Sequence, residues 1–350
     1  MGFLSLRIIK ILLIATALCV TLSAWTLSWR LDLSQVSQNT VTAIQEWSTD
    51  YLRRSNRTLG FEKILVISTG SSWRLEGLLK ASNFTGFDVE VPRQPQWTSQ
   101  YVDEFRGIGT VDKTIRVGPG QARCWLGHLN ALSYMIEREW ATALIMEDDV
   151  DWDIAIKEQF ALVAPHIRSV TQSWSSSARL PYGNKWDLLW VGHCGDAIPK
   201  SGGVYIFDDT LPRTADYREN NGRHIQLTSK PQQRVIHISD GPVCTYAYAL
   251  TLAAARKVFQ HSRNGVENII TTDLRQWCQA GFLTCVTVNP ELFHHHKKAG
   301  EVSSEIAVVE GWDSLATPAS VDFTANIRYS ARCNSVSSKL VTCIDETIHD

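Results

Sequence analysis

The sequence predicts an α/β fold with a mostly parallel central sheet, and two observations support this prediction. The folded part opens with a β-α-β pattern, in which strands over Lys63–Ser68 and Phe87–Val91 flank a short helix over Trp73–Lys80. Further along the chain, the apolar run Ala143–Met146 shows no alternation of polar and apolar residues. Such a run is typical of a strand that is buried on both faces of a parallel sheet.

The composition indicates an ordinary globular protein. The chain has 350 residues, of which 44% are hydrophobic and 20% are charged, with a formal net charge of -2. This length is sufficient for a full hydrophobic core. The sequence has no basic excess, so we expect no nucleic acid among its partners.

Residues 1–30 are predicted to form a short cytoplasmic tip and a transmembrane anchor. Arg7 and Lys10 precede the apolar run Ile11–Leu27, which is long enough to cross a bilayer when counted from Leu4. Positive charge on the N-terminal side places that end in the cytoplasm and the remainder in the lumen of the ER or Golgi. The alternative is a cleaved signal peptide and a secreted protein. Both interpretations send the chain into the secretory pathway.

Residues 31–60 are polar and weakly patterned, as expected for a stem between the anchor and the folded domain. Asn56-Arg57-Thr58 in this stem and Asn83-Phe84-Thr85 beyond it are acceptor sequences for N-glycosylation. Seven cysteines follow the anchor, so an oxidising lumen would leave at least one free or paired between chains. No CxxC pair is present, and a zinc site is therefore not expected.

The folded domain is predicted to cover residues 61–300. A break at Gly118-Pro119-Gly120 precedes a long helix over Gln121–Glu139, whose apolar residues recur at helical spacing. The remaining expected helices are Ile154–Ala164, Leu252–His261 with Thr251 as its cap, and one capped by Thr271 or Thr272. The remaining expected strands are Trp186–Val191, Val204–Phe207, Arg234–Ile238, Thr245–Ala249 and Leu283–Val288. Residues 301–350 are predicted to form an irregular tail.

The run Ala143–Met146 ends abruptly in Glu147-Asp148-Asp149. Open α/β sheets bind their ligands at the carboxyl ends of their strands. Clustered carboxylates resist burial unless a cation compensates them, and oxygen ligands suit Mg²⁺ or Mn²⁺. An imidazole from the cluster His294-His295-His296 could complete such a site. The alternatives are a solvated acidic turn that caps the next helix and a solvated basic loop for the histidines.

Three further polar residues stand at positions where they could bind a ligand. Arg123 lies near the start of a predicted helix, where it could meet a phosphate. His128 lies on the same helix, and its alternative role is a core histidine that is hydrogen-bonded to the backbone. Asp273 falls in the first turn of another helix, where it could act as a base or interact with the helix dipole.

These motifs, in this order, resemble family 25 of the glycosyltransferases, which includes bacterial lipooligosaccharide galactosyltransferases and collagen β-galactosyltransferases. The matching blocks are the β-α opening with Arg74, G-Q-A-R-C-W-L-G-H (Gly120–His128), E-W-A-T-A-L-I-M-E-D-D-V (Glu139–Val150), D-L-L-W-V-G (Asp187–Gly192), T-Y-A-Y-A-L (Thr245–Leu250) and Thr272-Asp273. The extended block Asp187–Asp196 is similar to fungal members. The resemblance spans about residues 63–298.

The resemblance implies a GT-A-like nucleotide-sugar-binding fold, inversion at the anomeric carbon and a divalent metal. It implies transfer of a sugar from a UDP-sugar to a glycan or glycoprotein acceptor, with galactose as the sugar that the resemblance favours. The roles that follow are donor binding by Arg74, Arg123 and His128, metal binding by Glu147, Asp148, Asp149 and His296, and general base catalysis by Asp273.

The motifs also depart from the family pattern, most clearly at Gln121, where the family has an acid. Two other classes of function therefore stay open. One is an inactive glycan- or nucleotide-binding protein on the same fold. The other is a metal-dependent phosphohydrolase, which the acidic cluster alone would permit.

Overall fold

The computed structural model describes residues 56–108, 117–173, 180–213, 217, 231–301 and 319–343. All of these belong to one compact unit, Thr49–Asp350. The predicted anchor and nearly all of the predicted stem lie outside the described residues. Among the helices that are described, none is long and apolar enough to cross a membrane.

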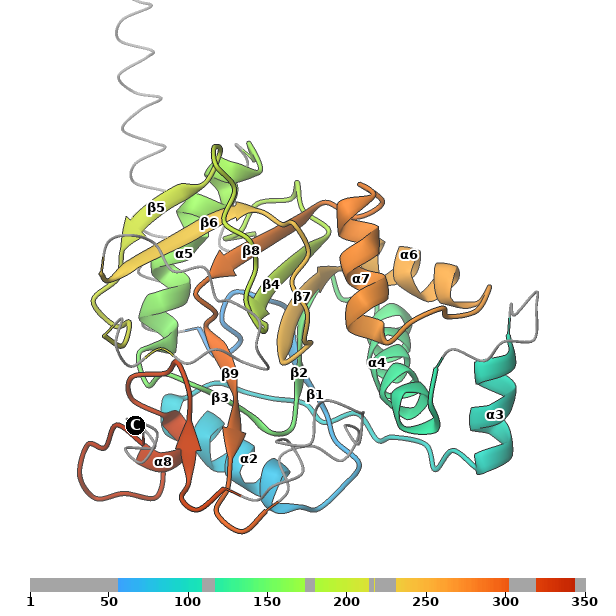
Figure 1. Cartoon of the computed structure of the whole chain (residues 1–350), viewed down its shortest axis with the longest axis horizontal. Helices are drawn as coiled ribbons and strands as arrows, with labels where there is room; N and C mark the ends of the chain where they lie inside the picture. Colours follow the sequence, from blue (N-terminus) through green and yellow to red (C-terminus); the bar gives the residue numbers. More distant parts are fainter. Residues whose placement is uncertain are drawn as a thin grey trace, which may run out of the picture. The chain divides into compact units, whose positions relative to one another are not determined.

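The centre of the fold is a seven-stranded sheet in the order β1-β2-β7-β4-β8-β6-β5 (Figure 1). The strands are β1 (Lys63–Ile67), β2 (Thr142–Glu147), β4 (Leu188–Gly192), β5 (Val204–Phe207), β6 (Gln233–Ile238), β7 (Ala247–Thr251) and β8 (Cys285–Asn289). The pairs β1–β2 and β4–β8 are parallel, and the other four neighbouring pairs are antiparallel. The sheet is therefore mixed, with fewer parallel pairs than the mostly parallel sheet that the sequence predicted. Five strands point one way, whereas β6 and β7 point the other way.

Helices cover both faces of this sheet, which confirms the α/β class. The helices α2 (Trp73–Thr85) and α5 (Ile156–Val170) contribute to one hydrophobic core. The helices α3 (Ser99–Gly107), α4 (Pro119–Glu137), α6 (Leu252–Ser262) and α7 (Ile270–Gln279) contribute to a second core on the opposite face (Figure 1). Alternate residues of β1 divide between the two, with Ile64 and Val66 in the first core and Leu65 in the second.

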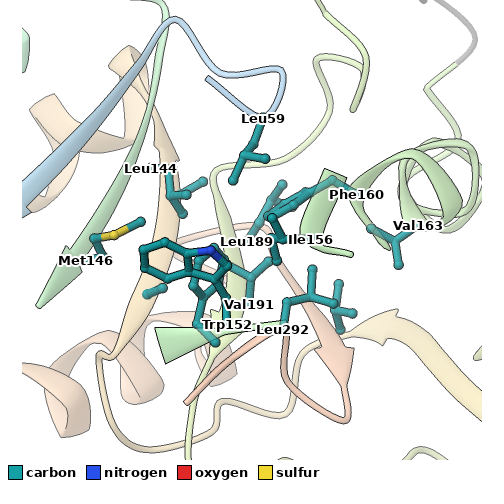
Figure 2. Packing of buried hydrophobic residues seen from close by; sticks show 14 of the residues in the cluster. Leu59, Leu144, Met146, Trp152, Ile156, Phe160, Val163, Leu189, Val191 and Leu292 are labelled. Atoms are coloured by element: carbon teal, nitrogen blue, oxygen red, sulfur yellow. The ribbon is translucent and has the colours of Figure 1, made fainter. Parts of the chain in front are cut away.

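The first core is built around large side chains that come from distant parts of the chain. Leu144 and Met146 of β2 meet Trp152, Phe160 of α5 and Leu292 there (Figure 2). All five side chains are buried. Burying a large apolar side chain stabilises a fold by about 2 kcal/mol, so this core fixes the carboxyl end of β2 firmly.

A second sheet of three antiparallel strands, β10-β9-β3, continues from that core. Its strands are β3 (Val150–Trp152), β9 (Phe293–Lys297) and β10 (Phe323–Thr324). This sheet corrects the expectation that the histidine cluster His294-His295-His296 is a solvated loop. All three histidines are buried in β9, because β3 and β10 pair with its two edges.

The segment expected to be an irregular tail is partly ordered as well. Its described part, residues 319–343, contains β10, the short helix α8 (Ala331–Asn334) and the disulfide Cys333–Cys343. Two further disulfides are Cys194–Cys244 and Cys278–Cys285. Cys124 is the free cysteine among the described residues, as the odd count predicted.

The expected strand Phe87–Val91 is reduced to a single bridge between Leu65 and Glu90. Glu90 exchanges both of its backbone hydrogen bonds with β1, to Ile64 and from Val66. The next donor in that ladder would be the amide of residue 92, which is a proline and has no N–H. The pairing therefore stops after one bridge.

Helix starts were predicted with mixed success. Thr251 caps α6 through a hydrogen bond that its side chain accepts from the amide of Ala254, as expected. By contrast, α7 begins after Ile269, so neither Thr271 nor Thr272 is its cap, although Asp273 does lie in its first turn. The helix therefore starts two or three residues earlier than the sequence signal indicated.

The two predicted glycosylation sequons differ in exposure. Asn56 is only 2% exposed, and the amide nitrogen that would carry a glycan is buried. Its side-chain oxygen accepts hydrogen bonds from the amide and the hydroxyl of Thr58. The expectation that Asn56 stands in an exposed stem is thus wrong. Asn83, near the end of α2, is exposed.

Candidate functional site

Glu147, Asp148 and Asp149 form the feature that we call the acid turn, at the carboxyl edge of β1 and β2. These strands are parallel with Ile67 opposite Glu147, so Ser68 and Asp148 leave the sheet at the same edge. The Ser68 hydroxyl donates to Asp148 Oδ2 over 2.6 Å. The antiparallel strand β7 enters at this edge, and the Thr245 hydroxyl before it donates to Glu147 Oε1 over 2.7 Å. Glu147 and Asp148 therefore point towards different neighbours.

His128 approaches Glu147 from the middle of α4. Its Nε2 lies 3.8 Å from Glu147 Oε1, and its Nδ1 shares a hydrogen bond of 2.8 Å with the hydroxyl of Tyr248. The core-histidine interpretation expected a hydrogen bond to the backbone. The partner of His128 Nδ1 is instead the side chain of a tyrosine. The preceding residue, Gly127, permits this approach, because a Cβ there would lie 3.1 Å from Ile67 Cγ2.

The three carboxylates of the acid turn are in different electrostatic states. Burial raises the pKa of Asp148, and the hydrogen bond from Ser68 offsets only part of this effect. Burial, followed by the charges of Glu147 and Asp148, raises the pKa of Asp149 to about 7. Burial alone would also raise the pKa of Glu147, but His128 and Thr245 outweigh it and hold that pKa below its ordinary value. Glu147 remains 30% exposed.

Two arginines lie close to the acid turn. Arg74, the second residue of α2, acts electrostatically on all three carboxylates and lowers their pKa. Arg332 of α8 acts in the same way on Asp148 and Asp149. The turn is thus a cluster of acids that the fold compensates with two buried guanidinium groups, of which the sequence predicted only Arg74.

The chemistry of the acid turn fits a hard divalent cation in one respect and not in another. Asp149 Oδ1 is buried without a hydrogen-bond partner, and a cation would satisfy this oxygen. Within the described ranges, however, no group of three His, Cys, Asp or Glu side chains is arranged to hold a metal ion. The divergence of Glu147 towards Thr245 and of Asp148 towards Ser68 is consistent with this finding.

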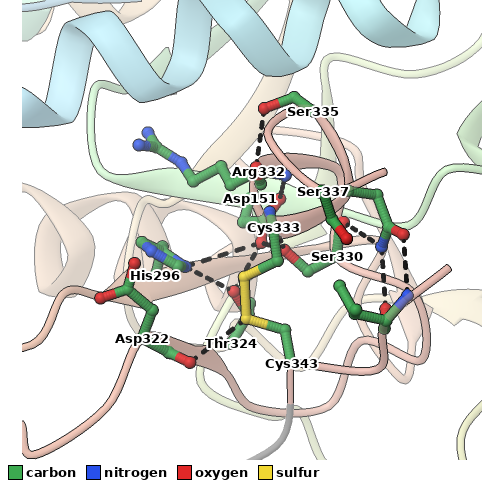
Figure 3. Close-up of a disulfide and its surroundings, with 12 residues drawn as sticks. Asp151, His296, Asp322, Thr324, Ser330, Arg332, Cys333, Ser335, Ser337 and Cys343 are labelled. Carbon is green, nitrogen blue, oxygen red and sulfur yellow. Dashed lines mark hydrogen bonds and ion pairs between the residues drawn. A yellow bond between two sulfur atoms is a disulfide. The ribbon is translucent and has the colours of Figure 1, made fainter. Parts of the chain in front are cut away.

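The structure does not direct the imidazole of His296 onto the acid turn. Its backbone N–H donates to Asp149 O, which makes the two residues neighbours. Its Nδ1 shares a hydrogen bond of 2.8 Å with Thr324 Oγ1 and lies 3.7 Å from Asp151 Oδ2 (Figure 3). Burial lowers the pKa of His296 to about 4. The Nδ1 atom of His296 thus belongs to the hydrogen-bond network of Asp151, and the role of His296 as a fourth metal ligand stays a prediction.

Arg123 and Asp273 make contacts of a structural kind. Arg123 is exposed, and its Nη1 donates to the carbonyl of Trp97. The carboxylate of Asp273 accepts hydrogen bonds from the side chain and the backbone of Asn268, which closes the loop before α7. Burial raises the pKa of Asp273. These are the contacts expected of a helix-start residue, the alternative that the sequence left open.

Gln121, the main departure from the family motif, also has a structural contact. Its side-chain oxygen accepts a hydrogen bond from the amide of Gly118 and so helps to begin α4. A glutamate could accept the same bond. The exchange of acid for amide at this position is therefore compatible with the start of the helix.

Sequence reasoning missed four residues of the site: Ser68, Thr245, Tyr248 and Arg332. Ser68 and Thr245 stand at or beside the ends of predicted strands, which was a signal for them, whereas Tyr248 lies within β7. Arg332 had no such signal, because it contacts Asp148 across a separation of 184 residues.

Comparison of the chain with known protein families and with curated proteins gives no match.

Proposed function

We propose that this protein is an inverting glycosyltransferase that transfers a sugar from a nucleotide-sugar donor to a glycan or glycoprotein. The observation that carries the proposal is the position of the acid turn at the carboxyl edge of the two parallel strands β1 and β2. Arg74 and His128 reach this edge from helices on opposite faces of the sheet. Ligands of open α/β sheets bind at such an edge.

The charges at this edge suit a sugar nucleotide with a bound cation. Asp149, together with Glu147 or Asp148, would hold Mn²⁺ or Mg²⁺, which as a Lewis acid stabilises the leaving diphosphate. Arg74 supplies positive charge beside the same carboxylates and would interact with the phosphates. The Thr245 hydroxyl donates to Glu147 Oε1 over 2.7 Å and would hold this carboxylate in place, while His128 Nε2 lies 3.8 Å from the same oxygen.

The remaining parts of the proposal rest on the resemblance to family 25. They are the choice of a UDP-sugar, galactose as the sugar, and Asp273 as the base that takes the proton of the acceptor hydroxyl. We also propose a type II anchor in the ER or Golgi membrane. The three disulfides of the folded unit support an oxidising compartment.

The proposal is tested by donor binding to the purified lumenal part of the chain. A panel of nucleotide sugars is screened by thermal shift, with Mn²⁺ and with EDTA. We expect one donor to raise the melting temperature with Mn²⁺, because a ligand that binds only the folded state stabilises it. Asp149→Asn should weaken this metal-dependent binding about tenfold or more, since a charged ligand is lost. Asp209→Asn, on the exposed Asp209, is the matched control.

Assays of transfer and of donor hydrolysis then separate the three classes of function. Sugar transfer that needs Mn²⁺ supports the glycosyltransferase. Hydrolysis of phosphate esters without transfer would indicate a phosphohydrolase, and binding without turnover would indicate an inactive binding protein. A wild-type protein whose melting temperature ignores Mn²⁺ and every nucleotide sugar would overturn the proposal.

A further inference from the structure

The segment Phe323–Cys343, which we call the C-terminal brace, lies against the strand that follows the acid turn. Its strand β10 pairs with β9, which in turn pairs with β3. The disulfide Cys333–Cys343 ties α8 to the end of the brace (Figure 3). The brace is thus covalently closed and joined to the core of the fold.

Asp151 anchors the brace. Its carboxylate accepts hydrogen bonds from the Thr324 hydroxyl over 2.5 Å, from the Ser330 hydroxyl, and from the amide of Arg332 over 3.0 Å (Figure 3). Asp153 accepts another from the amide of Tyr329 over 2.8 Å. Hydrogen bonds to a carboxylate are stronger than those between neutral groups, so they fix the position of the brace relative to β3.

Arg332 extends from the brace to the acid turn itself. Its Nε donates to the carbonyl of Val150 over 2.8 Å, and its Nη2 donates to the carbonyl of Asp148 over 2.6 Å. These two carbonyls flank Asp149 on either side. A planar guanidinium that donates to both of them fixes the backbone between them, whereas the ammonium of a lysine lacks this rigid fork of donors.

The guanidinium fits into a notch in α2 that a glycine creates. A Cβ at Gly77 would lie 2.3 Å from Arg332 Nη1, too close for any real contact. The nearest atom is the far end of a flexible side chain, so an alanine there would displace the guanidinium while α2 keeps its path. The guanidinium of Arg332 therefore packs against α2 on one side and donates to the backbone of the acid turn on the other.

We propose that Arg332 is a positioning residue that sets the conformation of the acid turn, and that the C-terminal brace is a required part of the donor site. This inference rests on the proposed function for its catalytic consequence, but its structural part can be tested separately. Arg332 does not touch the donor in this proposal. It acts through the backbone of Asp148 and Val150, and so determines where the carboxylate of Asp149 points.

The first test measures hydrogen exchange in peptides that cover residues 147–153, in the full lumenal part of the chain. Arg332→Lys and Gly77→Ala should each exchange about tenfold faster there, because the turn opens more easily. Gly107→Ala is the matched control, since a Cβ at that helical glycine meets nothing within 4 Å. Wild-type exchange in both Arg332→Lys and Gly77→Ala would overturn the proposal, whether or not the protein is a transferase.

The second test is a double-mutant cycle on donor binding and transfer. Each single variant should lower kcat/KM for the donor about tenfold or more, because misplacement of a catalytic group is costly. KM for the acceptor should stay unchanged. Gly77→Ala keeps the charge, so a loss there reports position and not electrostatics.

The double variant should be no worse than Arg332→Lys alone, since both changes act on the same guanidinium. Additive losses would contradict the proposal. If Arg332→Lys does not fold, the comparison of Gly77→Ala with Gly107→Ala still decides it. If the wild type binds no nucleotide sugar, the proposed function fails, and the exchange experiment alone judges the role of Arg332.

Discussion

The acid turn and the two aspartates that follow it differ sharply although all five acids lie within seven residues. Asp151 is fully buried, and three donors of the C-terminal brace satisfy its carboxylate. In contrast, Asp148 receives one hydrogen bond from a side chain, and Asp149 Oδ1 receives none. The carboxylate of Asp151 is thus fully hydrogen-bonded, whereas Asp149 keeps one buried oxygen without a hydrogen-bond donor despite the two arginines nearby.

This difference indicates which acids are available to a ligand. A buried carboxylate without enough donors is costly to a protein, and sites that bear such a cost are often functional. A carboxylate that is fully hydrogen-bonded is better explained by structure. On this basis the acid turn is the candidate ligand site, whereas Asp151 and Asp153 hold the brace to β3.

The largest expected effect is that of Asp151→Asn on stability. The amide would present N–H groups to donors that now face an oxygen, and it would remove the charge near Arg332. We expect the free energy of unfolding to fall by about 3 kcal/mol. Denaturant unfolding with Asp149→Asn as the control measures this. A loss smaller than about 1 kcal/mol would mean that the two groups of acids do not differ as described.

The next effect is the pH dependence of Asp149→Asn, measured in EDTA. Because the pKa of Asp149 is about 7 in the folded protein, the folded chain keeps a proton that the unfolded chain loses near pH 4. This group therefore lowers stability as the pH rises from 4 to 7. The asparagine variant should lack that contribution and become more stable than the wild type towards pH 7.

The informative quantity is the difference in the free energy of unfolding between the wild type and Asp149→Asn. His193 and His294 have pKa values that burial lowers, to about 3 and about 4, and they contribute a slope of the opposite sign in both proteins. Unfolding curves at pH 4 and pH 7 provide the measurement. If the free energy of unfolding changed equally between pH 4 and pH 7 in the wild type and in Asp149→Asn, the carboxylate of Asp149 would not have a raised pKa.

A smaller effect on stability is expected for Asp273→Asn. This variant tests whether Asp273 is a functional acid, like those of the acid turn, or a structural acid, like Asp151. The change weakens a loop contact to Asn268 and should cost about 1 kcal/mol. If Asp273 is the base, transfer should fall about a hundredfold or more while donor affinity stays the same. Full transfer activity would leave it with the structural acids, beside Asp151.

The smallest effect on stability concerns the two sequons, where the same contrast between satisfied and accessible groups applies. In a eukaryotic host, Asn83→Gln should remove a glycan and change stability by less than about 0.5 kcal/mol, as expected for an exposed position. Asn56→Gln should leave the mass lost on glycosidase treatment unchanged. A smaller loss of mass in Asn56→Gln would show that the buried amide is modified.

The sequence by itself determined the α/β class, most strands of the main sheet, the helix α4 and the acid turn at the end of β2. Each of these follows from local patterns, since burial on two faces, helical periodicity and abrupt strand ends can be recognised within about twenty consecutive residues. The leftover cysteine followed from counting. Arg74, His128 and the three acids, which the resemblance to family 25 grouped at one site, do lie near one another in the structure.

The tertiary structure alone decided what those residues contact. The burial of His294, His295 and His296 depends on the pairing of β9 with strands at residues 150 and 323, which no local pattern encodes. The direction of β7, which brings Thr245 to Glu147, depends on its pairing with β2. Arg332 reaches the acid turn only because the brace folds back on Asp151. Such contacts join residues that are far apart in the chain, so their free energy belongs to the assembled fold and not to any one segment.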